Sequence, residues 1–276
     1  MGKLVARKTS FYYAFLVLPG EQRRAIIAVW DFCRAVDDAV DESPASLVAA
    51  PGRRAAIESW RAELARCYDG STAETPQGRC LQPFIRQFDL RREFFDDLID
   101  GVAMDLDTTR YRTFADLFEY CRRVASAVGF ICIQVFGCAS DAAREYALNL
   151  GIALQLTNIL RDIPGDLASG RLYLPLDDLE ACQCTVDDLA GGRATDPVRR
   201  VIRFECERAR GFYARARECL PAAERRRLIA AEIMRAVYFE TLRRIERNNY
   251  DVFSARARVP RPQQAWIALK QWLWTR

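Results

Sequence analysis

RAVDDAVDE at residues 34–42 and QLTNILRD at residues 155–162 are the two stretches that say most about this chain. At about 100° per residue, each gathers its polar side chains on one face of a helix, within arcs of about 100° and about 120°. These side chains are Arg34, Asp37, Asp38 and Asp41 on the first face, and Gln155, Asn158, Arg161 and Asp162 on the second. Carboxylate and amide oxygens suit Mg²⁺, and arginine binds phosphate oxygens in pairs. The two faces together indicate two metal-bridged diphosphates in one cavity.

Helical periodicity continues on both sides of these stretches. Apolar residues recur at helical spacing, as at Ile26, Trp30 and Cys33. Helices are predicted over residues 21–41, 53–67, 81–90, 92–105, 113–136, 141–163, 197–218, 222–249 and 262–274. The glycine- and proline-rich residues 164–197 are predicted to be the one extended loop. Strand–helix alternation, GxGxxG and GxxxxGK[ST] are all missing. The sequence therefore predicts an all-α fold, a single domain over residues 1–276 that forms a large helical bundle around a central cavity.

Composition narrows the class of protein. Half of the 276 residues are hydrophobic, which is enough for a sizeable core. The net charge of +4 is spread along the chain and does not indicate nucleic-acid binding. No run reaches the roughly 20 apolar residues of a membrane-spanning helix. The apolar residues 11–18 lack the cleavage pattern of a signal peptide, so we expect a cytoplasmic protein.

The ten cysteines predict neither a disulfide framework nor a zinc site. There is no CxxC pair, and Cys182 and Cys184 have a spacing that matches no zinc signature. Most of the others lie among apolar neighbours and are expected to be small core residues. The chain has no histidine, which excludes imidazole acid–base chemistry. Any proton transfer must use tyrosine, a carboxylate, lysine, water or the substrate.

Several further segments resemble the squalene and phytoene synthase family, over a range from about residue 10 to residue 270. They follow the family's order and spacing at residues 10–15 (SFYYAF), 33–42, 124–129, 158–166, 170–175 (GRLYLP) and 250–253 (YDVF). Within the family the chain is most similar to bacterial presqualene diphosphate synthases of hopanoid pathways. That resemblance implies an all-α isoprenoid synthase that condenses two farnesyl diphosphates head to head. The reaction would depend on Mg²⁺, with Mn²⁺ as a substitute, and would stop at the cyclopropyl diphosphate without using NADPH.

The resemblance also implies roles for individual residues. Metal ligation is implied for Asp37, Asp38, Asp41, Asn158, Asp162 and Asp166. Contact with the substrate diphosphates is implied for Ser10, Arg34, Gln155, Arg161, Arg171, Tyr173 and Tyr250. A part in catalysis is implied for Asp37, Asp41, Asp162, Arg161 and Tyr250.

Two features bear on this assignment. Pro164 follows Asp162 closely and is expected to end or kink the helix near Ile163, which would move Asp166 off the shared face. Ala125, Ala127 and Gly129 recur along a buried helix, where they either leave room for a prenyl chain or allow close packing of helices.

Other functions remain open from the sequence. Phytoene synthase would use the longer geranylgeranyl diphosphate, and a full squalene synthase would use NADPH. A non-catalytic helical binding or assembly factor is a third alternative, although it would be expected to lose the aspartates. Trp266, Trp272 and Trp274 could rest on a membrane surface or pack as part of a terminal helix. Contacts with enzymes that act later in the pathway are also left open.

Overall fold

The structure, a computed structural model, describes residues 12–41 and 50–275. These residues form helices and contain no β-sheet, apart from one isolated bridge between Arg110 and Leu172. The helices are α2 (Tyr12–Leu16), α3 (Gly20–Asp41), α4 (Ala50–Asp69), α5 (Pro76–Gln87), α6 (Arg92–Asp107), α7 (Phe114–Cys121), the π-helix η1 (Arg122–Ser126), α8 (Ala127–Phe136), α9 (Asp141–Ala168), α10 (Leu176–Ala181), α11 (Val186–Ala190), α12 (Asp196–Glu218), α13 (Ile229–Arg247) and α14 (Arg261–Thr275). The prediction of an all-α helical bundle is confirmed.

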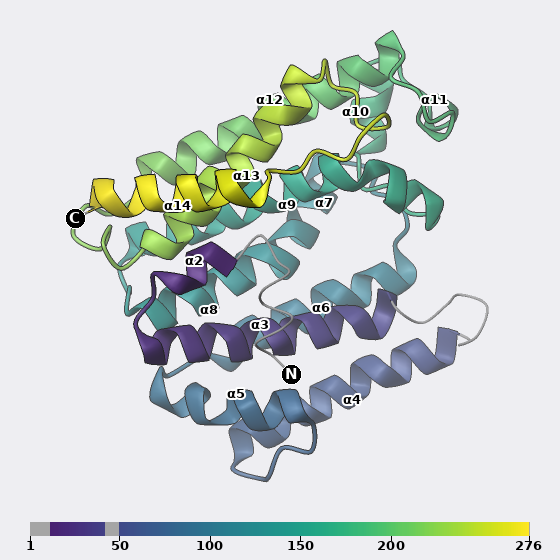
Figure 1. The fold of residues 1–276 in the computed structure, drawn as a ribbon. Helices are drawn as coiled ribbons and strands as arrows, with labels where there is room; N and C mark the ends of the chain where they lie inside the picture. The colour runs from purple at the N-terminus through teal and green to yellow at the C-terminus, as the bar shows by residue number, and fades with distance from the viewer. Residues whose placement is uncertain (1–11, 42–49, 276) are drawn as a thin grey trace.

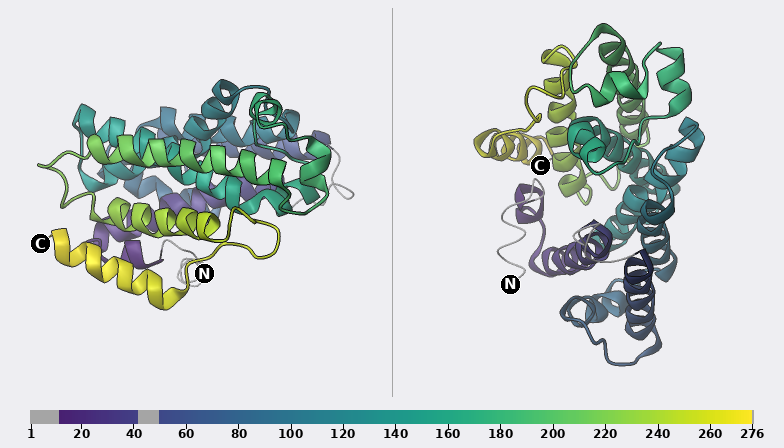
Figure 2. Two further views of the ribbon diagram at one scale, coloured as in Figure 1. Left: turned by 90° about the horizontal axis from the view of Figure 1, so that it is seen from above. Right: turned by 90° about the vertical axis from the view of Figure 1, so that its right-hand side faces the viewer.

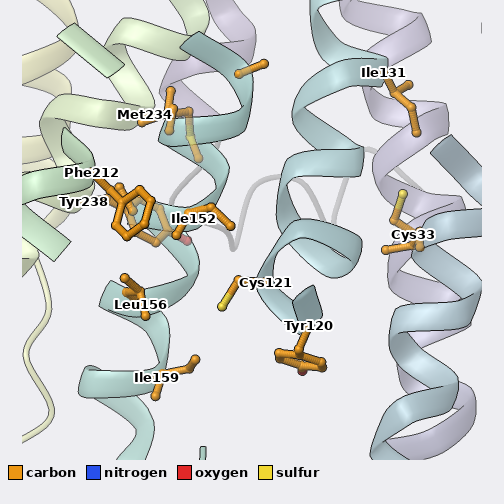
Figure 3. Close-up of a cluster of buried hydrophobic side chains, with 14 of the residues drawn as sticks. Cys33, Tyr120, Cys121, Ile131, Ile152, Leu156, Ile159, Phe212, Met234 and Tyr238 are labelled. Atoms are coloured by element: carbon orange, nitrogen blue, oxygen red, sulfur yellow. The ribbon is translucent and has the colours of Figure 1, made fainter. Parts of the chain in front are cut away.

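Helix α9 is the centre of the arrangement (Figure 1). It packs most extensively against α12 and also contacts α8, η1 and α13. Helices α4 and α5 pack outside α3 and α6 on one side, while α13 and α14 lie on the other, as the turned views show (Figure 2). Buried side chains from α2 to α14 form one hydrophobic cluster. Figure 3 shows part of it, with Tyr120, Ile152 and Met234 contributed by α7, α9 and α13.

Local sequence explains where the central helices begin and end. Gly137 ends α8 with φ of 74°, a left-handed backbone that glycine adopts readily. Ser140 then caps α9, because its hydroxyl accepts a hydrogen bond from the backbone N–H of Ala143 at 3.1 Å. At α7, Thr113 and Asp116 form a reciprocal capping box. Gly137 and Ser140 together fix the start of α9, the helix that carries the second polar face.

The structure corrects two sequence-based expectations. Helix α9 does not end near Ile163 but passes through Pro164 and continues to Ala168. A proline inside a helix removes one hydrogen bond, here the one to the carbonyl of Leu160, and the packing of α9 on its neighbours outweighs that loss. The predicted loop over residues 164–197 also contains α10 and α11. Helix α11 begins at a capping box formed by Thr185 and Asp188.

Close approach of helices around η1 depends on two glycines. A Cβ atom on Gly151 of α9 would lie 2.6 Å from the Cα and Oγ atoms of Ser126. A Cβ on Gly101 of α6 would lie 2.7 Å from Cγ1 of Val124. The π-helical turn is therefore held between α6 and α9 at distances that a side chain larger than hydrogen does not permit.

A buried ion cluster joins α10 to α12. Nη1 of Arg208 lies 2.6 Å from an oxygen of Asp178 and 2.5 Å from Oε1 of Glu205. Oε2 of Glu205 is buried with no hydrogen-bond partner. Burial raises the pKa of Glu205 to about 8, although the charge of Arg208 opposes this shift. Burial outweighs the charge of Arg208 because this arginine is shared with Asp178 and pairs with only one oxygen of Glu205.

Candidate active site

Both polar faces line a single cavity of about 1000 Å³. Its wall is built from α2, α3, α6, the continuous stretch from α7 to α8, α9, α13 and the residues that lead into α14. The predicted site residues in this wall are Arg34, Asp37, Gln155, Asn158, Arg161, Asp162, Asp166, Arg171 and Tyr173. Because α9 continues through Pro164, Asp166 lines the same cavity as Asp162.

The remaining predicted residues of the first cluster and the N-terminus are Asp38, Asp41 and Ser10. Asp38 does not line the cavity and pairs with Arg34 one turn away, with Oδ1 of the carboxylate 2.7 Å from Nε. Asp41 is the last residue of α3, and only its backbone position is described. Ser10 lies outside the described residues.

Tyr250 lies away from the cavity wall. Helix α13 ends at Arg247, and Asn249 and Tyr250 then adopt left-handed backbone conformations with φ of 52° and 59°. This turn carries the Tyr250 ring toward α12, where the guanidinium of Arg203 lies 5.0 Å from the ring centroid. The roles of Tyr250 in catalysis and diphosphate contact stay predictions. Among the tyrosines of α13, Tyr238 does line the cavity.

Asp162 is held by two arginines. Nε of Arg161 donates to its Oδ1 at 3.0 Å, and Nη2 lies 2.5 Å from its Oδ2. Nε of Arg256, from the segment before α14, donates to the same Oδ1 at 2.7 Å. Burial disfavours the charge of Asp162, but these two arginines outweigh that effect and keep its pKa below the ordinary value. Asp162 is therefore an ionised carboxylate at neutral pH.

A cluster that the sequence did not reveal lies in the same wall. Asp105 of α6 accepts hydrogen bonds from the hydroxyls of Tyr120 at 3.1 Å and Tyr173 at 2.9 Å. The two phenol rings stack with centroids 5.2 Å apart, and Tyr111 stacks on Tyr173 from outside the cavity. Burial, followed by the charge of Asp105, raises the pKa of both Tyr120 and Tyr173. Both phenols therefore stay protonated at neutral pH and act as donors.

These three residues come from separate elements, and no local pattern links them. Asp105 ended a predicted helix and carried no further signal. Tyr173 was singled out only through the family resemblance. Nothing in the sequence around Tyr120 distinguishes it from a core residue.

More cationic and polar groups line the cavity than the sequence predicted. Arg256 and Arg258 reach it from the segment between α13 and α14, and Arg261 reaches it from the first residue of α14. Burial raises the pKa of Tyr238, against the opposing contacts of its hydroxyl with Arg161 and Asn158. The polar end of the cavity therefore presents arginines from three separate regions of the chain.

The opposite end of the cavity is apolar. Along α9 the lining residues change from polar between Gln155 and Asp166 to mostly apolar between Tyr146 and Leu154. With a rise of 1.5 Å per residue, Tyr146 and Asp162 are separated by about 24 Å along the helix. Other apolar lining residues are Phe15, Val29, Val102, Val128, Cys132, Phe136 and Met234. One elongated cavity thus combines a charged end with an apolar end.

The small residues of the family-like segment divide between the two roles considered for them. Ala125 and Gly129 line the cavity, whereas Ala127 is fully buried away from it. A Cβ on Gly129 would lie 3.1 Å from the backbone oxygen of Ala147. Gly129 therefore serves both the cavity and the packing of α8 on α9.

The donor set at the polar end fits Mg²⁺. Oδ1 of Asn158 is buried and has no hydrogen-bond partner, so an oxygen ligand is available beside Asp162. Asp37 and Asp166 add carboxylates to the same wall. Within the described ranges, no three carboxylate or cysteine side chains converge closely enough to hold a metal ion on their own. Mg²⁺ in proteins is usually bound through one or two carboxylates and keeps its other positions for water and substrate phosphates.

Comparison with known proteins identifies the family. The model of the squalene/phytoene synthase family matches residues 4–263. The chain belongs to the squalene/phytoene synthase family. It is 37% identical to a phytoene synthase from Arthrospira platensis over 266 residues, which cover 91% of this chain and 84% of that protein. It is 36% identical to a 15-cis-phytoene synthase from Synechococcus elongatus, with the same coverage of both chains.

Solved structures of family members share the fold. The squalene synthase HpnC from Alicyclobacillus acidocaldarius superposes with a TM-score of 0.77 at 35% identity, covering 87% of this chain and 89% of the other. A dehydrosqualene synthase superposes with a TM-score of 0.87 at 25% identity, covering 99% and 94%. The protein is therefore a prenyltransferase whose family carries out head-to-head condensation of prenyl diphosphates. The helices of the described residues include none that is long and apolar enough to cross a membrane.

Proposed function

We propose that this squalene/phytoene synthase family member joins two farnesyl diphosphates to form presqualene diphosphate. The observation that carries the proposal is the single cavity that both acidic faces line at one end and apolar side chains line at the other. In this proposal the charged end binds two diphosphates, and the apolar end holds two prenyl chains.

In the proposed reaction, the C1–O bond of one farnesyl diphosphate breaks and diphosphate leaves. The resulting allylic cation is attacked by the double bond of the second molecule. Loss of a proton then closes a cyclopropane, so that two substrates give presqualene diphosphate, diphosphate and a proton. Mg²⁺ held by Asp37 on one side, and by Asn158, Asp162 and Asp166 on the other, would neutralise the charge of the departing diphosphate.

Side chains of the protein bind the diphosphates and exclude water. Arg34, Arg171 and Arg256 present guanidinium groups that pair with diphosphate oxygens. Tyr120 and Tyr173 donate hydrogen bonds from their hydroxyls to Asp105, which holds this carboxylate and both rings in place in the cavity wall. The apolar wall excludes water, which would otherwise capture the cation as an alcohol.

Phytoene synthesis from geranylgeranyl diphosphate is the second candidate. The names of the sequence relatives favour it, since those at 36–37% identity are phytoene synthases. The similarity to HpnC at 35% identity favours the farnesyl reaction. Phe136 and Tyr146 add bulk at the apolar end, which suits the shorter of the two prenyl chains.

The test is an incubation of the purified protein with farnesyl diphosphate and Mg²⁺, without NADPH, followed by mass spectrometry. We expect a C30 cyclopropyl diphosphate, no squalene when NADPH is added, and slower conversion of geranylgeranyl diphosphate. If a C40 product forms from geranylgeranyl diphosphate faster than the C30 product forms from farnesyl diphosphate, the protein is assigned as a phytoene synthase. No product from either substrate would contradict the enzymatic assignment and favour a binding factor.

A further inference from the structure

The exposed apolar side chains of this protein are concentrated in one place. Within the described part of the chain, α14 carries four of the six large hydrophobic side chains that are exposed by more than 40%. These are Trp266 (65%), Leu269 (45%), Leu273 (57%) and Trp274 (73%). A fifth, Leu16, lies on α2, which contacts α14. The sixth, Phe204, lies on α12 beneath the guanidinium of Arg208 at 4.8 Å.

The spacing on α14 places these side chains together. At about 100° per residue, Leu269, Leu273, Trp266, Lys270 and Trp274 fall within an arc of about 140°. Gln264 and Ala268, at 8% and 7% exposure, point in the opposite direction, toward the rest of the protein. Trp272 is only partly exposed and is not part of the outer face. We refer to Trp266, Leu269, Leu273, Trp274 and Leu16 as the α14 face.

The helices that carry the α14 face also form the wall of the cavity. Ala14 and Phe15 of α2 line the cavity, as do Arg261 and Gln264 at the start of α14. Figure 1 shows α14 running beside α13 and above α2. Figure 2 shows α14 and α2 at the edge of the molecule. The exposed apolar surface and the wall of the cavity therefore share α2 and the start of α14.

The charged residues of the two helices that carry the face are positive. Helix α14 contains Arg261 and Lys270 and has no acidic residue, and α2 has no charged residue. The ammonium of Lys270 lies 5.5 Å from the ring centroid of Trp274. Arg23 donates to the backbone oxygen of Leu16 at 3.0 Å, which brings a further cation to this edge. Exposed tryptophans with lysine and arginine at their border suit the interface of an anionic bilayer.

We propose that the α14 face docks the protein on the surface of an anionic lipid bilayer. The helix lies in the interface with Trp266, Leu269, Leu273 and Trp274 inserted among the lipids, while Lys270 pairs with headgroups. This inference does not depend on which prenyl diphosphate the enzyme uses. If the proposed function holds, docking places the helical wall of the cavity against the membrane that receives an apolar product.

The test measures binding of the full chain to vesicles, and needs no turnover. Vesicles of phosphatidylcholine with phosphatidylglycerol are compared with vesicles of phosphatidylcholine alone, by sedimentation at low and high salt. A Trp266→Ala/Trp274→Ala double variant removes both exposed rings, and Phe204→Ala is the matched control, because it removes an exposed ring from α12. Circular dichroism verifies that each variant keeps its helical content, and light scattering gives its oligomeric state.

We expect the wild type to bind the anionic vesicles, with weaker binding at high salt. The double variant should lose about tenfold or more in affinity, because each inserted ring buries a large apolar area, and Phe204→Ala should bind like the wild type. No binding by the wild type, or equal binding by the double variant, would overturn the proposal. A dimer that dissociates in the double variant, without a change in vesicle binding, would also overturn it and assign the face to a second copy.

Discussion

Replacing Gly151 by alanine should destabilise the protein, because the new methyl group has no room. Its Cβ would lie 2.6 Å from Cα and Oγ of Ser126 and 2.7 Å from its backbone nitrogen. Two of these three atoms belong to the backbone of η1, so a rotation of the Ser126 side chain cannot relieve the overlap. Overpacking of this kind costs about 1–3 kcal/mol. For a protein of this size, the midpoint of thermal unfolding should fall by about 2–12 °C, taking about 2–4 °C per kcal/mol.

The same helix offers a matched control. Gly165 also lies within α9, and a Cβ there would meet nothing within 4 Å. Gly165→Ala should therefore raise the free energy of unfolding by about 0.4–1 kcal/mol, because alanine reduces the conformational entropy of the unfolded chain. Thermal unfolding followed by circular dichroism at 222 nm measures both variants. Equal midpoints for Gly151→Ala and the wild type would refute the close contact between α9 and η1.

Three further predictions concern the site and the buried ion cluster. Asp37→Ala and Asp162→Ala should each lower turnover at least about 100-fold while the circular dichroism stays unchanged; undiminished turnover in both would contradict the two-face site. Asp105→Asn should destabilise the protein by about 1–3 kcal/mol, since one of two phenol hydroxyls loses its acceptor, and urea unfolding would show this. Glu205 has a folded-state pKa of about 8, above its ordinary 4.5, so its stabilising contribution is complete below pH 4.5 and is lost as pH rises through 8. Stability of Glu205→Gln relative to the wild type should therefore increase over that pH range, and a constant difference would exclude the raised pKa.

The helices of the core and the polar half of the site could be predicted because their signals are local. Asp37 shares a helix face with Arg34, and Asp162 shares one with Asn158, through the period of the helix alone. The convergence of the two faces on one cavity could be expected from their shared chemistry, and the structure brings both faces into the same wall.

Other features depend on contacts that local sequence does not encode. Pro164 is a strong local signal for a helix end, and the packing of α9 overrides it. The Tyr120, Asp105 and Tyr173 cluster joins residues from three elements, so no spacing could reveal it. Tyr250 matches a family segment, but the left-handed backbone before and at this residue directs its ring to Arg203 instead of the cavity.

The most direct test of the central claim is a crystal structure of the protein with Mg²⁺ and a farnesyl thiodiphosphate that cannot ionise. We predict two analogue molecules in the one cavity, with one diphosphate beside Arg34 and Asp37 and the other beside Asn158 and Asp162. Both prenyl chains should lie among the apolar residues toward Tyr146. A single analogue bound at one face, or a diphosphate bound outside the cavity, would contradict the account.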